Sequence, residues 1–157
     1  MQSLSPNAAA PERFTLLNAA GAQPHQAAND DESLLDRVML QGPVASIWHT
    51  QQSLVVPRSY RRFENFGQVC AQFAQHGWPV TVRQTGGGLV PQGPGIVNLS
   101  LAYGVQGPPM QHSEAGYLLI CELLADALRS IGIEAFPAAV EGSFCDGRYN
   151  LAVRQAG

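Results

Sequence analysis

Three stretches with helical periodicity, separated by short strand-like runs, constrain the fold of this chain more than any other feature. The helices are expected over 29–42, 59–77 and 113–132, where apolar residues recur every three or four positions. The first stretch opens with Asn29 and Glu32 in the spacing of a capping box, and all three close at a glycine. The sequence therefore predicts three amphipathic helices, each of which must bury one face.

The second and third of these helices are expected to start at serines. Ser59 and Ser113 are residue types that cap helix N-termini, and each precedes an apolar stripe. Cys70 falls on the stripe of the second helix and Cys121 on that of the third. Both cysteines are therefore predicted to lie in the core.

Short runs rich in β-branched residues lie before, between and after the helices. They read RFTLLN, VASIWHT, SLVVP, PVTVRQ, GIVNLSLAY, IEAFPAAV and YNLAVR. Only Gln51 and Gln52 separate the second run from the third, so we expect those two to form a hairpin or a close pair. Paired strands between helices favour an α+β fold with a mixed sheet over a regular parallel βαβ wind. Helices would then cover one face of the sheet and leave the other for a ligand.

Composition and charge exclude several classes of function. The 157 residues are enough for one domain, and residues 1–12, rich in Ala, Pro and Ser, are expected to form a mobile tail. A net charge of -3 gives no basic footprint for nucleic acid, and no apolar run approaches the ~20 residues that cross a bilayer. The first dozen residues do not read as a secretory signal, so a cytoplasmic location is predicted. Three cysteines without CxxC spacing predict neither a disulfide framework nor a bound metal.

A glycine triplet at 86–88 carries the first chemical signal. It follows a predicted strand that ends near Arg83, and three residues without Cβ atoms let the backbone approach a ligand closely. Backbone N–H groups of such a loop can bind a carboxylate or a phosphate, and an arginine adds paired hydrogen bonds to either anion. The spacing alone is equally that of a glycine-rich hairpin with a surface arginine, because it fits neither common phosphate-binding pattern.

The residues around this triplet resemble a known family. RQTGGG, followed on the next strand by Asn98-Leu99-Ser100, is similar to the lipoate-protein ligase signature, in which RRxxGGG precedes a G-N-x-N-(Y/F)-S strand. FCDGRYNLAV near the end resembles a second segment of the biotin/lipoate ligase and octanoyltransferase group. The resemblance runs from about Phe14 to the last residue. It implies a biotin/lipoate ligase-like fold, of which residues 13–157 would form the N-terminal major part.

The resemblance also implies an activity and a set of site residues. The activity is acyl transfer of lipoate or octanoate to a lysine of a lipoyl-domain protein or a glycine-cleavage H-type protein. In the ligase version the acyl group is activated with ATP and Mg as an acyl-adenylate. The residues expected to bind substrate or nucleotide are Arg83, Thr85, Gly86, Gly87, Gly88, Asn98, Ser100, Asp146, Tyr149 and Asn150.

Two further versions of the function stay open. In one branch of the family the acyl chain passes through a cysteine thioester, and Cys145, beside Asp146, stands in the corresponding place. Cys145 would otherwise be a cysteine in the pocket wall, because no histidine lies near it in sequence to activate it. The third version is a non-catalytic homologue that binds an acyl chain.

The chain departs from the family pattern at three places, and the first is the single Arg83 after Val82 where the family has two arginines. Pro91-Gln92-Gly93 stands where many ligases carry Tyr-His-Asp. All nine basic residues are arginines, so the lysine that the family uses to contact the acyl carboxyl is missing. We expect the native gene product to continue beyond Gly157 into a Gly/Arg-Lys segment, since YNLAVR reads as a strand without a turn or a partner.

Other residues carry weaker signals. Trp48 is expected either in the core or in the wall of a tunnel around an apolar chain. Arg58, Arg61 and Arg62 form a basic cluster that is typical of a solvated helix start and could also steer an acidic lipoyl domain.

Overall fold

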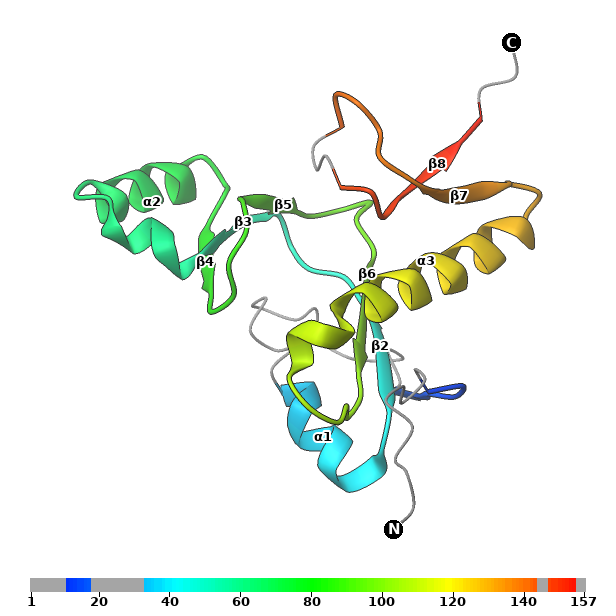
Figure 1. Ribbon diagram of the computed structural model, residues 1–157. Helices are drawn as coiled ribbons and strands as arrows, with labels where there is room; N and C mark the ends of the chain where they lie inside the picture. Colours follow the sequence, from blue (N-terminus) through cyan, green and yellow to red (C-terminus); the bar gives the residue numbers. More distant parts are fainter. Residues whose placement is uncertain (1–10, 18–32, 144–146, 155–157) are drawn as a thin grey trace. The chain divides into compact units, whose positions relative to one another are not determined.

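The computed structural model of the chain describes residues 11–17, 33–143 and 147–154 (Figure 1). These residues fall into two compact units, one formed by Pro11–Gly104 and the other by the residues from Val105 onwards. We call them the N-terminal and the C-terminal unit and describe each by itself.

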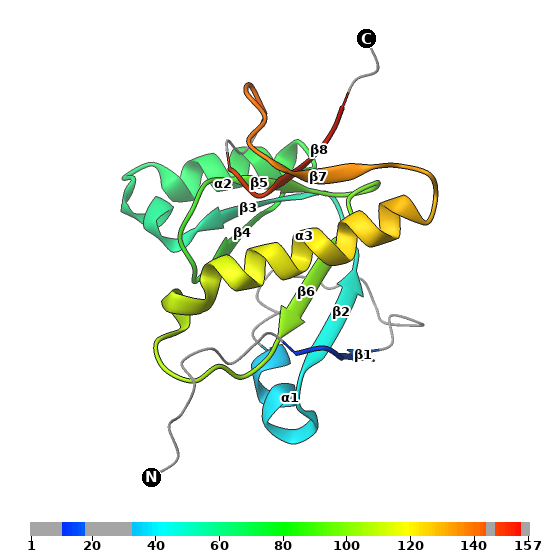
Figure 2. The same ribbon diagram turned by 45° about the vertical axis from the view of Figure 1, so that its right-hand side comes forward.

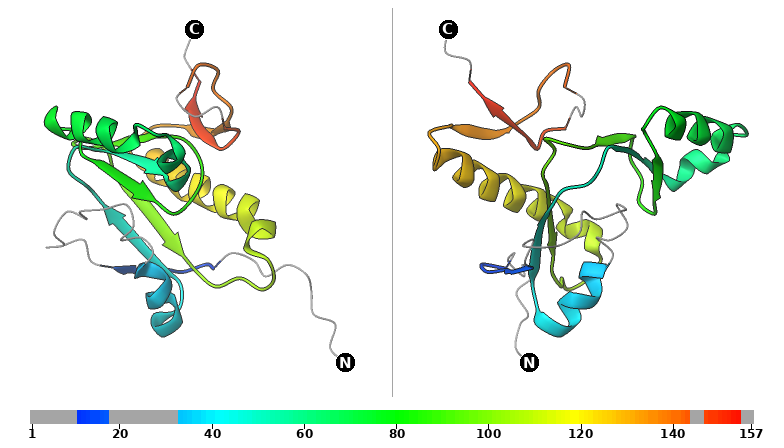
Figure 3. Two further views of the ribbon diagram at one scale, coloured as in Figure 1. Left: turned by 90° about the vertical axis from the view of Figure 1, so that its left-hand side faces the viewer. Right: turned by 180° about the vertical axis from the view of Figure 1, so that it is seen from behind.

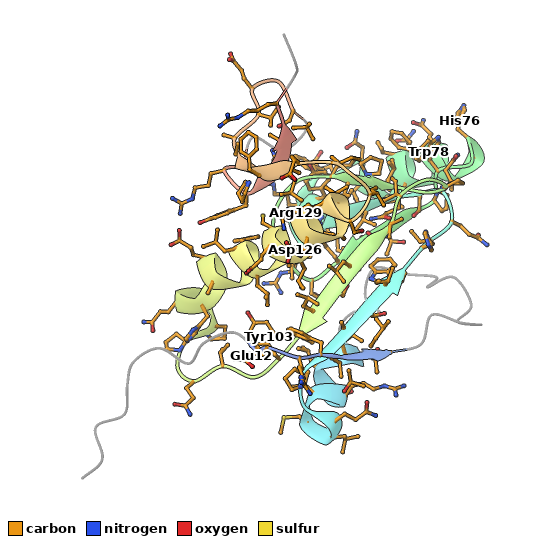
Figure 4. The ribbon with its side chains drawn as sticks, turned by 90° about the vertical axis from the view of Figure 1, so that its right-hand side faces the viewer. Glu12, His76, Trp78, Tyr103, Asp126 and Arg129 are labelled. Carbon is orange, nitrogen blue, oxygen red and sulfur yellow. The ribbon has the colours of Figure 1, made fainter. Side chains whose placement is uncertain are left out.

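The first mixed sheet of the N-terminal unit contains β1 (Thr15–Leu17), β2 (Val44–Trp48) and β6 (Asn98–Ala102). The strand β2 lies in the middle, parallel to β1 and antiparallel to β6. Figure 2 shows β2 and β6 side by side. Beside this sheet Tyr103, labelled in Figure 4, packs edge to face on Phe14 with ring centroids 5.9 Å apart. The predicted strands RFTLLN, VASIWHT and GIVNLSLAY are therefore confirmed.

Helix α1 (Ser33–Gln41) covers one face of this sheet at the start of β2. Leu34 packs there against Val44 and Ala102, and this cluster is the buried core of the region. The predicted stop is confirmed, because Gly42 has a φ of 76° and its amide closes the last turn on the carbonyl of Val38. The expected capping pair Asn29 and Glu32 lies outside the described residues.

The second mixed sheet contains β3 (Ser53–Pro57), β4 (Val80–Arg83) and β5 (Val90–Gln92). The order is β4-β3-β5, with β3 parallel to β4 and antiparallel to β5. No strand was expected over β5, which lies in a stretch rich in glycine and proline. The two mixed sheets and their helices confirm the predicted α+β class.

The expected hairpin between VASIWHT and SLVVP is wrong. The strand β2 pairs with β1 and β6, whereas β3 pairs with β4 and β5. Residues 49–52 separate β2 from β3. Their antiparallel partners, β6 and β5, are separated by residues 93–97. The two segments therefore belong to different sheets, and each pairs with strands that lie far away in sequence.

Helix α2 (Phe66–Gln75) covers one face of the second sheet and lies near β4 (Figure 3). It starts later than expected, because Ser59 lies within a 3-10 helix, η2 (Arg58–Arg62), which precedes Phe63. Past its end, Figure 4 labels His76 and Trp78, and the amide of Trp78 bonds back to the carbonyl of Phe73. Cys70 is half-buried and not fully in the core.

The C-terminal unit contains η3 (Pro109–His112), helix α3 (Ser113–Arg129) and the antiparallel strands β7 (Ala135–Ala138) and β8 (Asn150–Val153). Cys121 is buried as predicted, and Figure 4 labels Asp126 and Arg129, which form an ion pair on the exposed side of α3. Gly132 follows the helix with a φ of 82° and confirms the predicted stop.

Two expectations for this unit are corrected. Ser113 is the first helical residue and its hydroxyl donates backwards to the carbonyl of Met110, so it is not the N-cap. The run YNLAVR does not lack a partner, because β8 pairs with β7 over four residues from Ala135↔Val153 to Ala138↔Asn150. Within the described ranges, no helix is both long and apolar enough to cross a membrane.

Candidate functional site

The glycine loop is held together by Arg83, the last residue of β4. One terminal nitrogen of the guanidinium, Nη2, donates to the carbonyl oxygens of Gly86 at 2.8 Å and Gly88 at 3.1 Å. The Nε atom of the same side chain is buried and has no hydrogen-bond partner among the described residues. The loop therefore folds around the guanidinium, with the carbonyls turned inwards to it.

The conformation of this loop requires glycine at one position. Gly87 has a φ of 104°, and a Cβ atom built on it would lie 2.6 Å from Nη2 of Arg83. Gly86 and Gly88 have no heavy atom within 4 Å of such a Cβ. The triplet therefore has one obligatory glycine, Gly87, flanked by two that leave open space.

The loop connects two strands that lie on either side of β3. Pro57, at the end of β3, pairs with Arg83 and is fully buried, so the loop passes the end of the central strand on its way to β5. Registers place Val55, Val90 and Gln92 on the same face as Arg83, because side chains alternate along a strand and paired residues share a face. We call this face of the second sheet the site face.

A buried pair of side-chain amides connects the site face to the first sheet. Gln92, only 7% exposed, donates from Nε2 to Oδ1 of Asn98, and Asn98 donates from Nδ2 to Oε1 of Gln92, both at 3.0 Å. Asn98 pairs with Trp48 across β2 and β6, and Nε1 of the buried Trp48 donates to Oγ of Ser100 at 2.9 Å. These neutral side chains form a polar strip that satisfies its buried groups internally.

The predicted site residues of the N-terminal unit are thus brought together. Arg83 lies on the site face, and Asn98 and Ser100 lie in the strip that continues from it. Thr85 and the three glycines are exposed in the loop. None of the three glycine amides donates to another backbone carbonyl within the part of the chain that is described.

The predicted residue Tyr149 belongs to the C-terminal unit and is fixed to α3. Its ring stacks on Tyr117 with centroids 5.0 Å apart, its hydroxyl donates to Glu114 at 2.9 Å, and its carbonyl accepts from Sγ of Cys121 at 3.2 Å. The guanidinium of Arg148 lies 5.0 Å from the ring centroid and 3.6 Å from Glu114. Local desolvation and then the hydrogen bond to Glu114 raise the pKa of Tyr149 above its ordinary 10.0, so the phenol is neutral at physiological pH.

The remaining predicted residues lie on or near the segment that leads into β8. Asn150 donates from Nδ2 to the hydroxyl of Ser143 at 3.2 Å, which ties the start of β8 to the end of the preceding turn. Cys145 and Asp146 lie outside the described residues.

Comparison with known proteins identifies the family. Residues 23–155 match the lipoyl protein ligase A/B catalytic domain. This chain belongs to that family. The resemblance inferred from the glycine loop and the FCDGRYNLAV segment is thereby confirmed.

Relatives of this lipoyl ligase family chain include proteins with and without a described activity. An uncharacterized protein of Cupriavidus necator is 53% identical over 133 residues, which cover 85% of this chain and 51% of that protein. An octanoyl-[GcvH]:protein N-octanoyltransferase of Kyrpidia tusciae is 39% identical over 79 residues, covering 49% of this chain and 26% of that enzyme. The chain spans about half or less of the length of the curated relatives it matches.

Solved structures of similar fold support the same placement. Protein Ta0514 of T. acidophilum superimposes with a TM-score of 0.58 at 17% identity, over 89% of this chain and 57% of that one. A lipoate-protein ligase A bound with ATP gives a TM-score of 0.54 at 16% identity, over 87% and 53%. At such identities the likeness concerns the fold alone, and it confirms the predicted lipoate ligase-like architecture.

The sequence alone did not identify one residue of the candidate site and left another undecided. Gln92 was noted only as a departure from Tyr-His-Asp, yet it is the most buried member of the polar strip. Trp48 was left between core and tunnel wall, and its bond to Ser100 places it in the strip. The signal for both is the two-residue alternation on β5 and β2, which becomes readable only when the partner strands are known.

Proposed function

We propose that this protein transfers a medium-chain acyl group, octanoyl or lipoyl, to a lysine of a lipoyl-domain or H-type acceptor protein. The acyl donor is a neutral ester-like or amide-like carbonyl, as in an octanoyl group already carried by a thiol or by another protein. The names of the octanoyltransferase relatives support this class of donor and acceptor.

The main support for the proposal is the chemistry of the site face. The guanidinium of Arg83 is bound to the glycine loop and lies next to a strip of neutral hydrogen-bonding groups. Nη2 of Arg83 is committed to the carbonyls of Gly86 and Gly88, and beside it lie the Gln92–Asn98 amide pair and the Trp48–Ser100 bond. Neutral donors suit a neutral carbonyl, whereas a buried anion needs a free cation or several charge-assisted bonds. A thioester or amide donor therefore fits this strip better than a free carboxylate does.

We propose that the acyl tail follows the apolar side chains beside these groups. Val55 and Val90 share the site face with Arg83, and the indole of Trp48 is buried at the head of the polar strip. An alkyl chain that lies along these side chains removes apolar surface from water at about 25 cal/mol per Å². We place the tail along this path and the carbonyl at the glycine loop.

The chemical route that we propose passes through Cys145. Its thiolate attacks the acyl carbonyl, a C–S bond forms, and the bond to the donor's leaving group breaks while that group takes up a proton. The lysine amine of the acceptor then attacks the thioester, an amide bond forms, and the thiolate is released as the amine loses a proton. In both steps charge develops on the carbonyl oxygen, and we assign its stabilisation to the amides of Gly86 to Gly88.

A second candidate is the ATP-dependent ligase, which forms an acyl-adenylate with ATP and Mg. The observation in its favour is the unsatisfied Nε of Arg83 beside a loop whose glycine amides make no backbone bonds within the described residues. Such a loop has donors left for phosphate oxygens. None of the 157 residues is a lysine, so a lysine contact to the acyl-phosphate is not available from them.

The two routes are separated by one assay on the full-length protein. Octanoyl transfer to an apo lipoyl domain is followed by intact mass, once with an octanoyl thioester donor and no ATP, and once with octanoate and ATP-Mg. We expect transfer in the first reaction and its loss in Cys145→Ser. Transfer that occurs only in the second reaction, at the same rate in Cys145→Ser, would assign the ligase route, and binding without transfer in either would assign the non-catalytic role.

A further inference from the structure

A separate cavity lies behind the site face, between α2 and the second sheet. It has a volume of about 250 Å³, and its floor is formed by Leu54 and Val56 of β3 and Val80 of β4. Registers place these three side chains on the face opposite to Arg83. The cavity is therefore distinct from the candidate acyl-transfer site.

The wall of this cavity is mostly apolar. One side of α2 supplies Phe66, Val69, Cys70 and Phe73, which extend over roughly 10 Å of helix at 1.5 Å per residue. None of the lining residues is charged. An engineered apolar cavity of about 150 Å³ holds benzene, so by proportion 250 Å³ has room for a chain of up to about ten carbons.

A guanidinium lies beside the wall of the cavity. Phe63 lines the cavity, and the guanidinium of Arg62 lies 5.2 Å from the centroid of its ring. Arg58 and Arg61 belong to the same 3-10 helix, η2, and both are exposed. An apolar cavity with a cationic rim matches an amphiphile that has an alkyl tail and an anionic head.

We propose that this cavity is a second binding site, for a free medium-chain carboxylate such as octanoate. The tail lies between α2 and β3, and the carboxylate lies at the rim within reach of Arg62. The site requires neither Cys145 nor the glycine loop, so it is independent of the acyl-transfer route.

Cys70 provides a direct reporter, because its thiol is half-buried in the cavity wall while Cys121 is buried elsewhere. The test uses the full-length protein with Cys145→Ser and no acceptor, so that acyl transfer cannot contribute. Alkylation of Cys70 by iodoacetamide is timed by peptide mass spectrometry with sodium octanoate, 1-octanol or sodium butyrate. At ten times its dissociation constant octanoate should slow alkylation about tenfold by mass action, whereas butyrate should have little effect.

Two variants test the tail and the head separately. Val69→Trp fills the cavity and should remove protection by octanoate and by octanol. Arg62→Gln should weaken protection by octanoate roughly threefold, as for an exposed ion pair, and leave octanol unchanged. Arg61→Gln is the matched control and should behave as the parent protein does.

The proposal is overturned if octanoate leaves the alkylation rate of Cys70 unchanged, or if butyrate protects as well as octanoate. It is also overturned if octanoate protects Cys70 equally weakly in Arg61→Gln and Arg62→Gln, because the carboxylate would then have no specific partner in Arg62. Should Val69→Trp fail to fold, the comparison of octanoate with butyrate in the parent protein still decides. Normal acyl transfer together with an unprotected Cys70 would refute this site alone.

Discussion

Arg83 and Gly87 occupy their positions in the glycine loop only as a pair. The guanidinium of Arg83 lies where a side chain on Gly87 would begin, 2.6 Å from the position of its Cβ, and the positive φ of Gly87 is one that other residues rarely adopt. Arg83 in turn binds the carbonyls on both sides of Gly87. The conformation of the arginine therefore depends on the central glycine of the family motif, and that of the glycine on the arginine.

Gly87→Ala should disturb the loop much more than Gly86→Ala. The first substitution adds backbone strain of roughly 1–3 kcal/mol and displaces the guanidinium, whereas the second places its methyl group in open space. Urea unfolding and calorimetric titration with an octanoyl ligand measure the two effects. Gly87→Ala should bind at least tenfold more weakly, a loss of about 1.4 kcal/mol, and equal behaviour of both variants would refute the pairing of Arg83 with Gly87.

Arg83→Lys should fail to replace the arginine. A lysine ammonium is a point charge on a flexible stem and does not reproduce the planar guanidinium that the loop carbonyls surround. We expect kcat/KM for acyl transfer to fall roughly tenfold to a hundredfold, as for the loss of a positioned polar contact. Arg37→Lys on the exposed side of α1 is the control. Unchanged kcat/KM in Arg83→Lys would show that the glycine loop is not part of the site.

The Gln92–Asn98 amide pair should show coupled stability. Gln92→Met leaves the amide of Asn98 without its partner in a half-buried place, which costs about 1–3 kcal/mol in the free energy of unfolding. The double variant Gln92→Met, Asn98→Leu removes both groups and should cost less than the sum of the single variants. Strict additivity in a double-mutant cycle would show that the two reciprocal bonds do not form.

Tyr149 should make stability decrease at alkaline pH. Its folded pKa is raised above 10.0, so between 10.0 and the folded value the unfolded chain loses a proton that the folded chain keeps. The contribution is complete below pH 10 and is lost as pH rises through the folded pKa. Unfolding free energies measured across this range should fall less steeply in Tyr149→Phe, and an ultraviolet titration should place the pKa of Tyr149 lower in Glu114→Gln.

Local chemistry made part of this architecture predictable from the sequence. Gly42 and Gly132 end their helices as expected because a positive φ is a property of the glycine itself. Arg83 and Asn98 could be assigned to one site because a family motif links them. Motifs of this kind record long-range proximity that periodicity alone does not contain.

The failures in strand pairing and at Gln92 involve partners distant in sequence. The runs at β2 and β3 are adjacent in the chain, yet their pairing was decided by β6 and β5, which lie more than thirty residues away. Gln92 could not be recognised as a site residue before Ser53 was known to be its partner on β3. Ser59 has a capping side chain, but the chain first makes a 3-10 turn there, so the α-helix starts at Phe66.

We propose that this lipoyl ligase family chain moves an acyl group from a neutral donor to an acceptor lysine through Cys145. The most direct measurement incubates the full-length protein with an octanoyl thioester, without ATP, and maps any octanoyl adduct by peptide mass spectrometry before and after an apo lipoyl domain is added. We predict an octanoyl group on Cys145 that disappears as the acceptor lysine gains it, and no transfer in Cys145→Ser. An unmodified Cys145, together with octanoylation of the acceptor that requires ATP and proceeds equally in Cys145→Ser, would show that Cys145 does not carry the acyl group.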